Sequence, residues 1–273
     1  MTADFSVLMS LYYKEKPEYV EACFQSLLNQ TVKAAEWVIV EDGPLTDEMY
    51  TLLDRYQKQY PKLIRRVKLN DNQGLGLALR EGIPNCRFEL IARMDTDDIA
   101  LKNRFEKQLQ EFEKNPSLDI CGSQILEFED TPDRIVAKRS VPTEHADIIQ
   151  FQKKRDAFNH MSVMYKKAAV LKAGNYCSCP LMEDTYLWVR MIQSGAVCKN
   201  IPDSLVYVRI GHDMYERRGG WEYFLKYRAG RRKVLETGYI TYVDYLHTII
   251  VQLIVALMPS KVRGWIYKKK LHN

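Results

Sequence analysis

The sequence predicts an α/β fold: a mostly parallel, Rossmann-like sheet flanked by helices, with a helical extension at the C-terminus. In the first half, short apolar runs of strand length alternate with segments of helical periodicity. Such units of roughly 30 residues are typical of βαβ crossovers. The composition, with 46% hydrophobic and 27% charged residues, is that of an ordinary folded chain. A chain of 273 residues suffices for one large α/β domain, or for a domain with a substantial appendage.

Strands of the first half are expected where apolar residues run continuously, as they do in strands that are buried on both faces. Such a run covers residues 5–11 ("FSVLMSL"), and further strands are expected at 36–43, 64–69, 87–95 and 118–126. The segments between them have helical spacing. Pro17 marks the start of a helix at 17–30, and Thr46 is the expected N-cap of a helix within 45–60. Further helices are expected at 74–83 and 101–116.

The second half is less regular. Residues 158–176 read as a short strand, a helix and a glycine turn, residues 182–195 as a helix that opens with two acids, and "WEYFLKY" as the start of another helix. Residues 239–258 are strongly apolar, but their unbroken core "IIVQLIVALM" is shorter than the ~20 residues that span a bilayer. We therefore expect an interfacial or packed helix. The aromatic-then-basic "WIYKKK" that follows suits a membrane surface.

The net charge of +5 is unevenly distributed. Residues 209–273 hold 13 lysines and arginines against five acidic residues, so the first 208 residues are slightly acidic. A basic C-terminal part predicts an anionic partner: nucleic acid, phosphate groups or an acidic membrane surface. The six cysteines form no C-x-x-C pair and lie mostly in apolar contexts, which indicates reduced, buried thiols of a cytosolic protein. The strand-like run begins at Phe5, which leaves no room for a signal peptide.

An acidic cluster, "MDTDD", directly follows the predicted strand at 87–95 and contains Asp95, Asp97 and Asp98. One interpretation is a solvated loop without a function. A calcium loop of the EF-hand type would need a central glycine, which "DTDDIALKN" lacks. A phosphatase of the haloacid dehalogenase class would have Thr or Val in place of Ile99. Its motif would also normally follow the first strand, not the fourth. The remaining interpretation is a D-x-D motif that holds Mg²⁺ or Mn²⁺ against a diphosphate.

Loops that follow parallel strands share one edge of the sheet. This places "SLYYKEK" after the first strand, "EDGPL" after the second and "MDTDD" after the fourth on one edge. "VIVEDGPL" places Asp42 at the end of a buried strand, with Gly43 allowing a tight turn; an ordinary strand-terminal turn is the alternative. "NDNQGLGLALREG" lacks the third glycine of a dinucleotide fingerprint and reads as a helix start whose N–H groups face a ligand. Separately, "LMEDTYLWVRM" puts Glu183 and Asp184 at a helix N-terminus, where acids also simply complement the helix dipole.

The ordered set of motifs resembles the inverting glycosyltransferases of family 2, which have the glycosyltransferase-A fold. The resemblance covers roughly residues 5–225 and rests on "SVLMSLYYKE", "SLLNQT", "WVIVEDG", "NQGLGLALREG", "ARMDTDD", "HMSVMYKK" and "MEDTYLWVRM", in that order. "VRIGHDMYERRGG" further resembles the branch that builds bacterial O-antigen and exopolysaccharide units. The resemblance implies a catalytic domain at 1–225, with a nucleotide-sugar half (1–123) and an acceptor half (124–225). It also implies a basic, amphipathic helical extension at 226–273.

The resemblance also implies roles for individual residues. The catalytic base would be Asp184, with Glu183 beside it. Asp97 and Asp95 would hold Mn²⁺ or Mg²⁺, with Asp98 supporting them, and His212 is a further candidate ligand whose alternative is a structural histidine. The residues expected to contact the nucleotide sugar are Ser10, Tyr12, Glu15, Asp42 (to the base, usually uracil), Asn72, Gly74, Arg93, Asp95 (facing the ribose), Arg217 and Arg218.

The implied reaction is a metal-dependent single displacement that inverts the anomeric carbon. A UDP-sugar, with UDP-galactose or UDP-glucose favoured, would donate a hexose to a polyprenyl-diphosphate-linked saccharide, and a β-1,3 linkage is favoured. His160 in "FNHMS" is expected either to line the acceptor side or to be a core histidine. The sequence departs from many relatives at Met161, where they have Pro, and at "EDGP", where they have "DDGS".

The expected location is cytoplasmic, peripheral on the inner face of the cell membrane. The apolar helix, Trp265, Tyr267 and the lysines around them suit an anionic membrane surface; packing on the domain or a homodimer contact is the alternative. A nucleic-acid partner is not expected, because it would not explain the acidic edge.

Two rival functions have specific requirements. A nucleotide-sugar binder without transferase activity would lack the D-x-D motif or the base, and both are present. A sugar-phosphate nucleotidyltransferase would want a glycine-rich basic loop after the first strand, where this chain has "YYKEKPEY".

Overall fold

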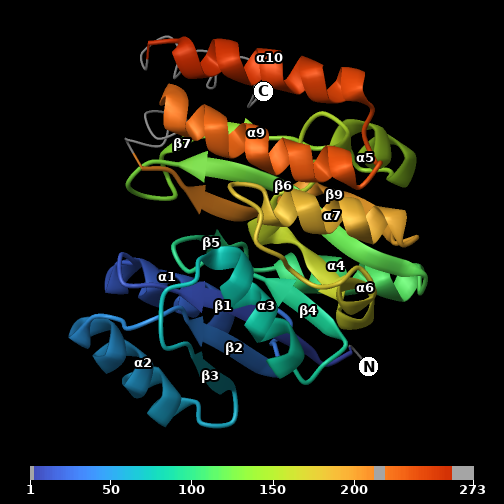
Figure 1. The fold of residues 1–273 in the computed structure, drawn as a ribbon. Coiled ribbons are helices and arrows are strands. Elements are labelled where there is room, and N and C mark those ends of the chain that lie inside the picture. Colours follow the sequence, from blue (N-terminus) through green and yellow to red (C-terminus); the bar gives the residue numbers. More distant parts are fainter. Residues whose placement is uncertain (1–2, 212–218, 260–273) are drawn as a thin grey trace.

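The computed structural model describes residues 3–211 and 219–259, which form a mixed α/β fold (Figure 1). Nine strands make one sheet in the order β3-β2-β1-β4-β8-β6-β9-β5, with β7 paired to β6. The strands are β1 (Phe5–Leu11), β2 (Glu36–Glu41), β3 (Ile64–Lys68), β4 (Leu90–Arg93), β5 (Ile99–Ala100), β6 (Leu118–Phe128), β7 (Ile135–Arg139), β8 (Met164–Lys166) and β9 (Val197–Arg209).

The helices cover both faces of this sheet. They are α1 (Pro17–Leu28), α2 (Asp47–Gln59), α3 (Leu75–Asn85), α4 (Arg104–Lys114), α5 (His145–Gln152), α6 (Lys167–Lys172), α7 (Glu183–Gln193), α9 (Gly220–Glu236) and α10 (Tyr242–Leu257), with a 3₁₀ turn η1 (His160–Ser162). As predicted, Pro17 is the first residue of α1, and the Thr46 side chain caps α2 by accepting a hydrogen bond from the Met49 amide.

Side chains of alternate residues of β1 enter two separate hydrophobic clusters, as the period of a strand requires. Phe5, Val7 and Met9 pack with α1, α2 and α4, whereas Leu8 packs with α3 and α7 on the opposite face. β1, β2 and β4 are therefore buried between two layers of helices, which explains their apolar sequences, whereas β3 at the edge of the sheet is only partly buried.

The predicted parallel arrangement holds for the first half. β3, β2, β1 and β4 are parallel to their neighbours, so the loops that follow them end on one edge. β8 then pairs antiparallel with both β4 and β6, while β6 and β9 are parallel again. This antiparallel strand lets η1, which precedes it, lie beside the carboxyl end of β4.

Four elements of the structure were not predicted: β5, β7, α5 and β9. The long strand β9 contains Pro202, Asp203 and Ser204, which read as a turn in the sequence. In the structure this part of β9 coincides with a register shift opposite Ser123 and Gln124 of β6. A bulge of this kind accommodates a proline that a regular ladder would exclude.

α9 and α10 form an antiparallel pair at the outer edge of the molecule (Figure 1). The proposed division of the chain at residues 123 and 225 stays a prediction; residue 123 lies within β6 and residue 225 within α9. Among the described residues, no helix combines the length and the apolar character needed to cross a membrane.

The close approach of α3 to the sheet gives a stability prediction. A Cβ atom built at Gly82 would lie 2.4 Å from Leu8 Cδ1 and 2.9 Å from Val40 Cγ2. We expect Gly82→Ala to lower the free energy of unfolding by about 1–2 kcal/mol, because overpacking outweighs the gain in helix propensity. Urea denaturation measures this change, and the exposed neighbour Glu81→Ala is the control. A Gly82→Ala variant as stable as the wild type would contradict the packing described here.

Candidate active site at the carboxyl edge of the sheet

The candidate site lies where the loops after β1, β2 and β4 meet η1 and the first turn of α7. Carboxylate oxygens of Asp95, Asp97 and Asp98 lie within 4.8 Å of one another. The loop is anchored from two sides: the Thr96 hydroxyl donates to the Ser10 carbonyl (3.4 Å), and the Arg209 amide donates to Asp98 Oδ1 (2.9 Å). Three carboxylates at this spacing fit the oxygen ligands that Mg²⁺ and Mn²⁺ prefer.

The pKa values in the cluster show how strongly these carboxylates repel. Burial and the neighbouring Asp95 raise the pKa of Asp97 to about 6. Burial, Asp97 and Asp95 raise the pKa of Glu15, from the loop after β1, to about 8. Burial and the same neighbours raise the pKa of Asp98 well above its usual range. A cation bound among these groups would relieve both repulsion and desolvation.

Asp95 differs from its neighbours because two cations contact it. Burial raises the pKa of Asp95, but the Arg93 guanidinium and the His160 ring outweigh burial and hold that pKa well below its usual range. Arg93 is 1% exposed and forms an ion pair with Asp95 Oδ1. Its Nε and Nη2 atoms are buried and have no hydrogen-bond partner within residues 3–211 and 219–259. Arg93 is thus a fixed positive charge beneath the cluster.

His160 lies between Asp95 and Asp184. Its Nε2 atom is 2.8 Å from Asp95 Oδ2, and its Nδ1 atom is 3.0 Å from Asp184 Oδ2. Burial lowers the pKa of His160, but the carboxylates of Asp184 and Asp95 outweigh it and raise the pKa to about 10. The ring is therefore protonated at neutral pH and donates to both carboxylates.

Glu183 and Asp184 occupy the first turn of α7, as predicted, but they face different surroundings. Asp184 contacts His160, and its Oδ1 atom is buried without a hydrogen-bond partner in the described part of the chain. Glu183 lines a cavity of about 180 Å³ together with the start of α3 and residues 178–180. Burial and the neighbouring Asp184 raise the pKa of Glu183.

Asp42 organises the loop that precedes α3. Its Oδ1 accepts from the Gln73 amide (2.7 Å), its Oδ2 accepts from the Gly74 amide (2.9 Å), and its carbonyl accepts from the Asn72 side chain (3.2 Å). Gly43 is required here, because its φ is +82° and a Cβ would lie 2.6 Å from the Asn72 nitrogen. The structure thus brings Asp42, Asn72 and Gly74 together, and contact of Asp42 with a nucleotide base stays a prediction.

Of the other residues predicted from the sequence, one lies at this edge and the rest lie outside the described part of the chain. Tyr12 follows β1 at the same edge and is 36% exposed. His212, Arg217 and Arg218 lie outside the described residues, as do Trp265 and Tyr267.

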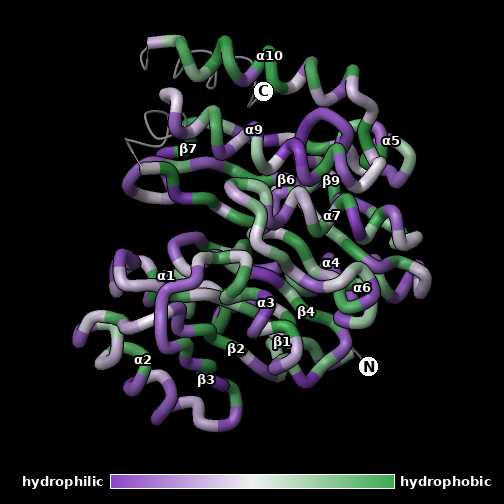
Figure 2. The backbone as a smooth tube through the Cα atoms, in the orientation of Figure 1, coloured by the Kyte–Doolittle hydropathy of each residue, from purple (hydrophilic) through white to green (hydrophobic). Residues whose placement is uncertain are grey.

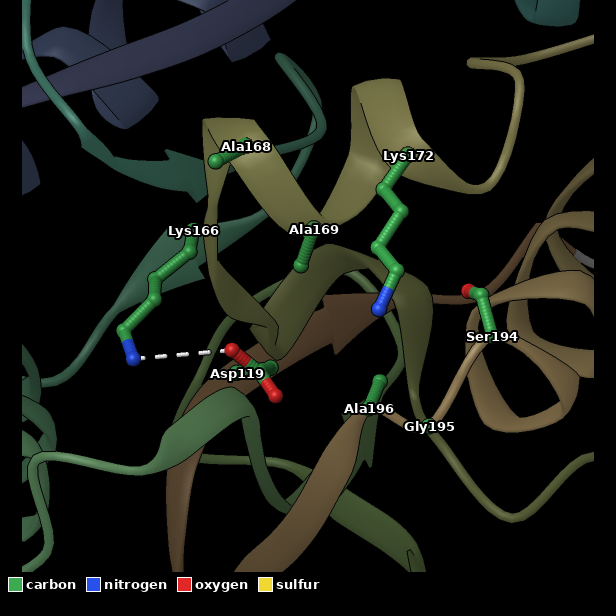
Figure 3. Close-up of a pocket in the computed structure, with 8 residues that line it drawn as sticks. All are labelled: Asp119, Lys166, Ala168, Ala169, Lys172, Ser194, Gly195 and Ala196. Carbon is green, nitrogen blue, oxygen red and sulfur yellow. Dashed lines mark ion pairs between the residues drawn. The ribbon is translucent and has the colours of Figure 1, made fainter.

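A second cavity, of about 190 Å³, lies at the opposite edge of the sheet (Figure 3). It is lined by the Asp119–Lys166 ion pair (3.5 Å) and by Lys172. Asp119 is near the start of β6, and Lys166 ends the antiparallel β8 beside the start of β4. Ligands of open α/β sheets bind beyond the carboxyl ends of the strands, so this cavity is not the candidate site.

Sequence reasoning missed one contributor, Arg209, and did not foresee the contacts of another, His160. Arg209, the last residue of β9, donates from Nε to the Asp97 carbonyl (3.2 Å), and its guanidinium lies over the rings of Tyr19 (3.9 Å) and Phe128 (4.6 Å). No sequence signal marked it, because β9 itself was not predicted. His160 was considered, but its contact with both Asp95 and Asp184 depends on how β8 pairs with β4.

Comparisons with known proteins agree with this geometry. Residues 6–171 match the family model described as glycosyl transferase family 2. The chain is 39% identical over 269 residues to the amylovoran biosynthesis glycosyltransferase AmsE of Erwinia amylovora, covering 97% of this chain and 98% of that protein. It is 35% identical over 273 residues to the UDP-Gal:alpha-D-GlcNAc-diphosphoundecaprenol beta-1,3-galactosyltransferase of Escherichia coli, covering 100% and 98%.

Among solved structures, the chain resembles the mannosyltransferase PcManGT from Pyrobaculum calidifontis in complex with GDP-Man and Mn²⁺. The TM-score is 0.65 at 13% identity, over 99% of this chain and 82% of that chain. At this identity the likeness concerns the fold, and it confirms the predicted glycosyltransferase-A architecture. The family model and the two relatives of nearly the same length show that the chain belongs to glycosyltransferase family 2 and is a transferase of polysaccharide biosynthesis.

Proposed function

We propose that the chain transfers a hexose from a UDP-sugar, with UDP-galactose or UDP-glucose favoured, to a polyprenyl-diphosphate-linked saccharide in bacterial surface polysaccharide synthesis. The observation that carries the proposal is that an acidic cluster able to hold a divalent cation lies one histidine away from Asp184, a carboxylate with an unpaired oxygen. The similarity to the galactosyltransferase that uses UDP-Gal and a diphosphoundecaprenol-linked acceptor supports the choice of donor and acceptor.

The proposed reaction is a single displacement. Asp184 Oδ1 accepts the proton of an acceptor hydroxyl, whose oxygen forms a bond to the anomeric carbon on the face opposite the leaving group. The bond from that carbon to the diphosphate oxygen breaks, and the nucleoside diphosphate leaves with the electron pair. An α-linked donor therefore gives a β-linked product. Arg93, buried next to Asp95, supplies fixed positive charge near the leaving group.

Asp95 and Asp97 are the proposed ligands of Mn²⁺ or Mg²⁺, and Asp98 supports them from its bond to the Arg209 amide. A bound cation would supply charge neutralisation for the diphosphate. His212 remains a candidate ligand. It follows Arg209 by three residues, and an extended chain of that length reaches about 10 Å.

α10 supports the proposed location on a membrane surface. A surface helix usually turns its apolar side towards the protein, whereas α10 turns its apolar side towards the solvent. The side facing the protein carries Thr248, Gln252 and Ala256, which are buried. Figure 2 shows α10 as largely hydrophobic although it lies at the outer edge of the molecule. The exposed apolar residues of this helix are Val243 (75% exposed), Leu246, Ile250, Val251, Ile254 and Leu257 (70%).

We propose that this outer face of α10 docks on an anionic lipid surface. Its spacing forms one apolar stripe along a helix of 16 residues, and Asp244 is its one charged residue. Positive charge for anionic head groups is available nearby in the chain. Arg228 and Arg232 of the adjacent α9 are exposed, and the sequence at 260–273 holds five lysines and arginines. Docking there would bring the enzyme to a lipid-linked acceptor.

The first of three predictions from the proposed function concerns the reaction. Screening purified protein with Mn²⁺ against nucleotide sugars, with and without a lipid-diphosphate N-acetylhexosamine acceptor, should give acceptor-dependent release of UDP from one donor. Asp184→Asn should lower kcat by about 100-fold or more, because the base is lost while donor binding remains. Donor binding without transfer in the wild type would favour a nucleotide-sugar binder, and no binding anywhere in the panel would contradict the proposal.

The second prediction concerns Asp97. Its pKa in the folded protein, about 6, lies above the ordinary value of 3.8. The ionised form of Asp97 therefore destabilises the metal-free fold above pH 6, and this cost disappears as the pH falls below 3.8. Asp97→Asn should raise the melting temperature of the metal-free protein at pH 7.5 by about 2–4 °C, which corresponds to a gain of about 1 kcal/mol in the free energy of unfolding. It should also remove the stabilisation of the wild type by Mn²⁺.

Thermal melts with and without Mn²⁺ at several pH values measure both effects. The gain of Asp97→Asn should shrink towards pH 4. Asp133→Asn, an exposed loop residue away from the cluster, is the matched control. A variant that melts below the wild type at pH 7.5, or that keeps the full Mn²⁺ stabilisation, would count against Asp97 as a ligand.

The third prediction concerns the membrane. The double variant Ile250→Ser/Ile254→Ser should bind phosphatidylcholine–phosphatidylglycerol vesicles at least about tenfold more weakly than the wild type, because two exposed side chains no longer enter the lipid. Its melting temperature should not change. Leu171→Ser, which alters an exposed leucine of α6, is the control in vesicle flotation. If the double variant instead converts a dimer to a monomer, and the wild type binds no vesicles, the face is a dimer contact.

A further inference from the structure

We infer that His160 is a positioning residue that fixes Asp184 relative to Asp95, and so fixes the base relative to the leaving group. One imidazole ring contacts both carboxylates, at 2.8 Å from Asp95 Oδ2 and 3.0 Å from Asp184 Oδ2. The side chain is 34% exposed, so it is not a core histidine, and neither of its nitrogens is left for an acceptor sugar. The inference rests on the proposed function, because it takes Asp184 as the base.

The backbone that carries His160 is held by buried hydrogen bonds. The Asn159 side chain donates to the Ser123 carbonyl (2.8 Å), and the Ser162 hydroxyl donates to the Asn159 carbonyl (2.8 Å). The Gln108 side chain of α4 donates to the Ser162 carbonyl (2.8 Å). Met161, between them, is buried in the hydrophobic core. Supporting contacts of this kind are what hold a functional side chain in one geometry.

The bridge also decides which oxygen of Asp184 is free. Oδ2 is occupied by His160, while Oδ1 is buried without a partner among the described residues. Of the two oxygens, Oδ1 is therefore the one left without a partner to accept a hydrogen bond. On the other side of the ring, Asp95 uses Oδ2 for His160 and Oδ1 for Arg93. A continuous line of contacts thus connects Arg93 to the base through Asp95 and His160.

Amide side chains can separate the two contacts of the ring. The amide nitrogen of asparagine lies near the position of imidazole Nδ1, and that of glutamine lies near the position of Nε2; both are donors. His160→Asn should therefore keep the hydrogen bond to Asp184, whereas His160→Gln should keep the one to Asp95. His160→Ala removes both.

The experiment measures kcat, the donor KM and donor binding by calorimetry for these three variants of the full chain, with the donor that the wild type uses. His160→Ala should lower kcat by about 100-fold, as expected for a displaced catalytic group, with donor affinity changed less than about threefold. His160→Asn should recover about tenfold of that loss and His160→Gln should recover less. Imidazole added to His160→Ala should restore part of kcat. The control is His145→Ala, a histidine of α5 whose ring accepts from the Cys198 amide.

A double-mutant cycle decides whether His160 acts through Asp184. In the Asp184→Asn background, His160→Ala should lower the residual rate by no more than about threefold, because the group that it positions is already gone. Multiplicative losses, a kcat of His160→Ala within threefold of the wild type, or asparagine and glutamine variants equal to alanine would each overturn the inference. A wild type that transfers no sugar would remove the proposed function and the inference together. Active wild type with multiplicative losses removes the inference alone.

Discussion

The structure of the site depends on one buried charge. Five carboxylates converge on the carboxyl edge of the sheet: Glu15, Asp95, Asp97, Asp98 and Asp184. Desolvation raises the pKa of Glu15, Asp97 and Asp98. Arg93 lies beneath them at the end of β4, fully buried and ion-paired with Asp95. Arg93 and His160 outweigh burial at Asp95 and hold the pKa of that carboxyl well below its usual range. At least one carboxylate of the cluster is therefore ionised at the place where we propose that a diphosphate binds.

The order of the strands determines which groups surround that charge. β8 pairs antiparallel with β4, so the Arg93 amide donates to the Val163 carbonyl (2.9 Å) and η1 is drawn alongside the acidic loop. Arg104 of α4 reinforces the same junction, since its guanidinium donates to the Arg93 carbonyl (2.6 Å). A parallel strand at this position would have carried His160 to the opposite edge. The reversal of one short strand thus brings His160, from the second half of the chain, alongside the acidic loop of the first half.

Much of the fold and part of the site could be predicted from the sequence, for identifiable reasons. Continuous apolar runs marked β1 to β4, and Pro17 and Thr46 marked helix starts, because these signals are local. Asp42, Asp95, Asp97 and Asp184 were placed by motif and strand end. The role of His160 was not predictable, because it depends on pairing between segments 65 residues or more apart. β9 was missed because Pro202 and its polar neighbours suggest a turn unless the bulge opposite β6 is known.

The anchoring of the acidic loop by Arg209 has a consequence for how this enzyme can diversify. The Arg209 amide and guanidinium hold Asp98 and Asp97 to the end of β9, while Tyr19 and Phe128 flank the guanidinium. The loop is thus in place before any donor arrives, and the entropy of ordering it is not lost on binding. The acidic loop, which we propose holds the diphosphate, is thus anchored by β9 and not by the residues around the cavity at α3 and α7. Substitutions that line that cavity can therefore accumulate without displacing the anchored loop.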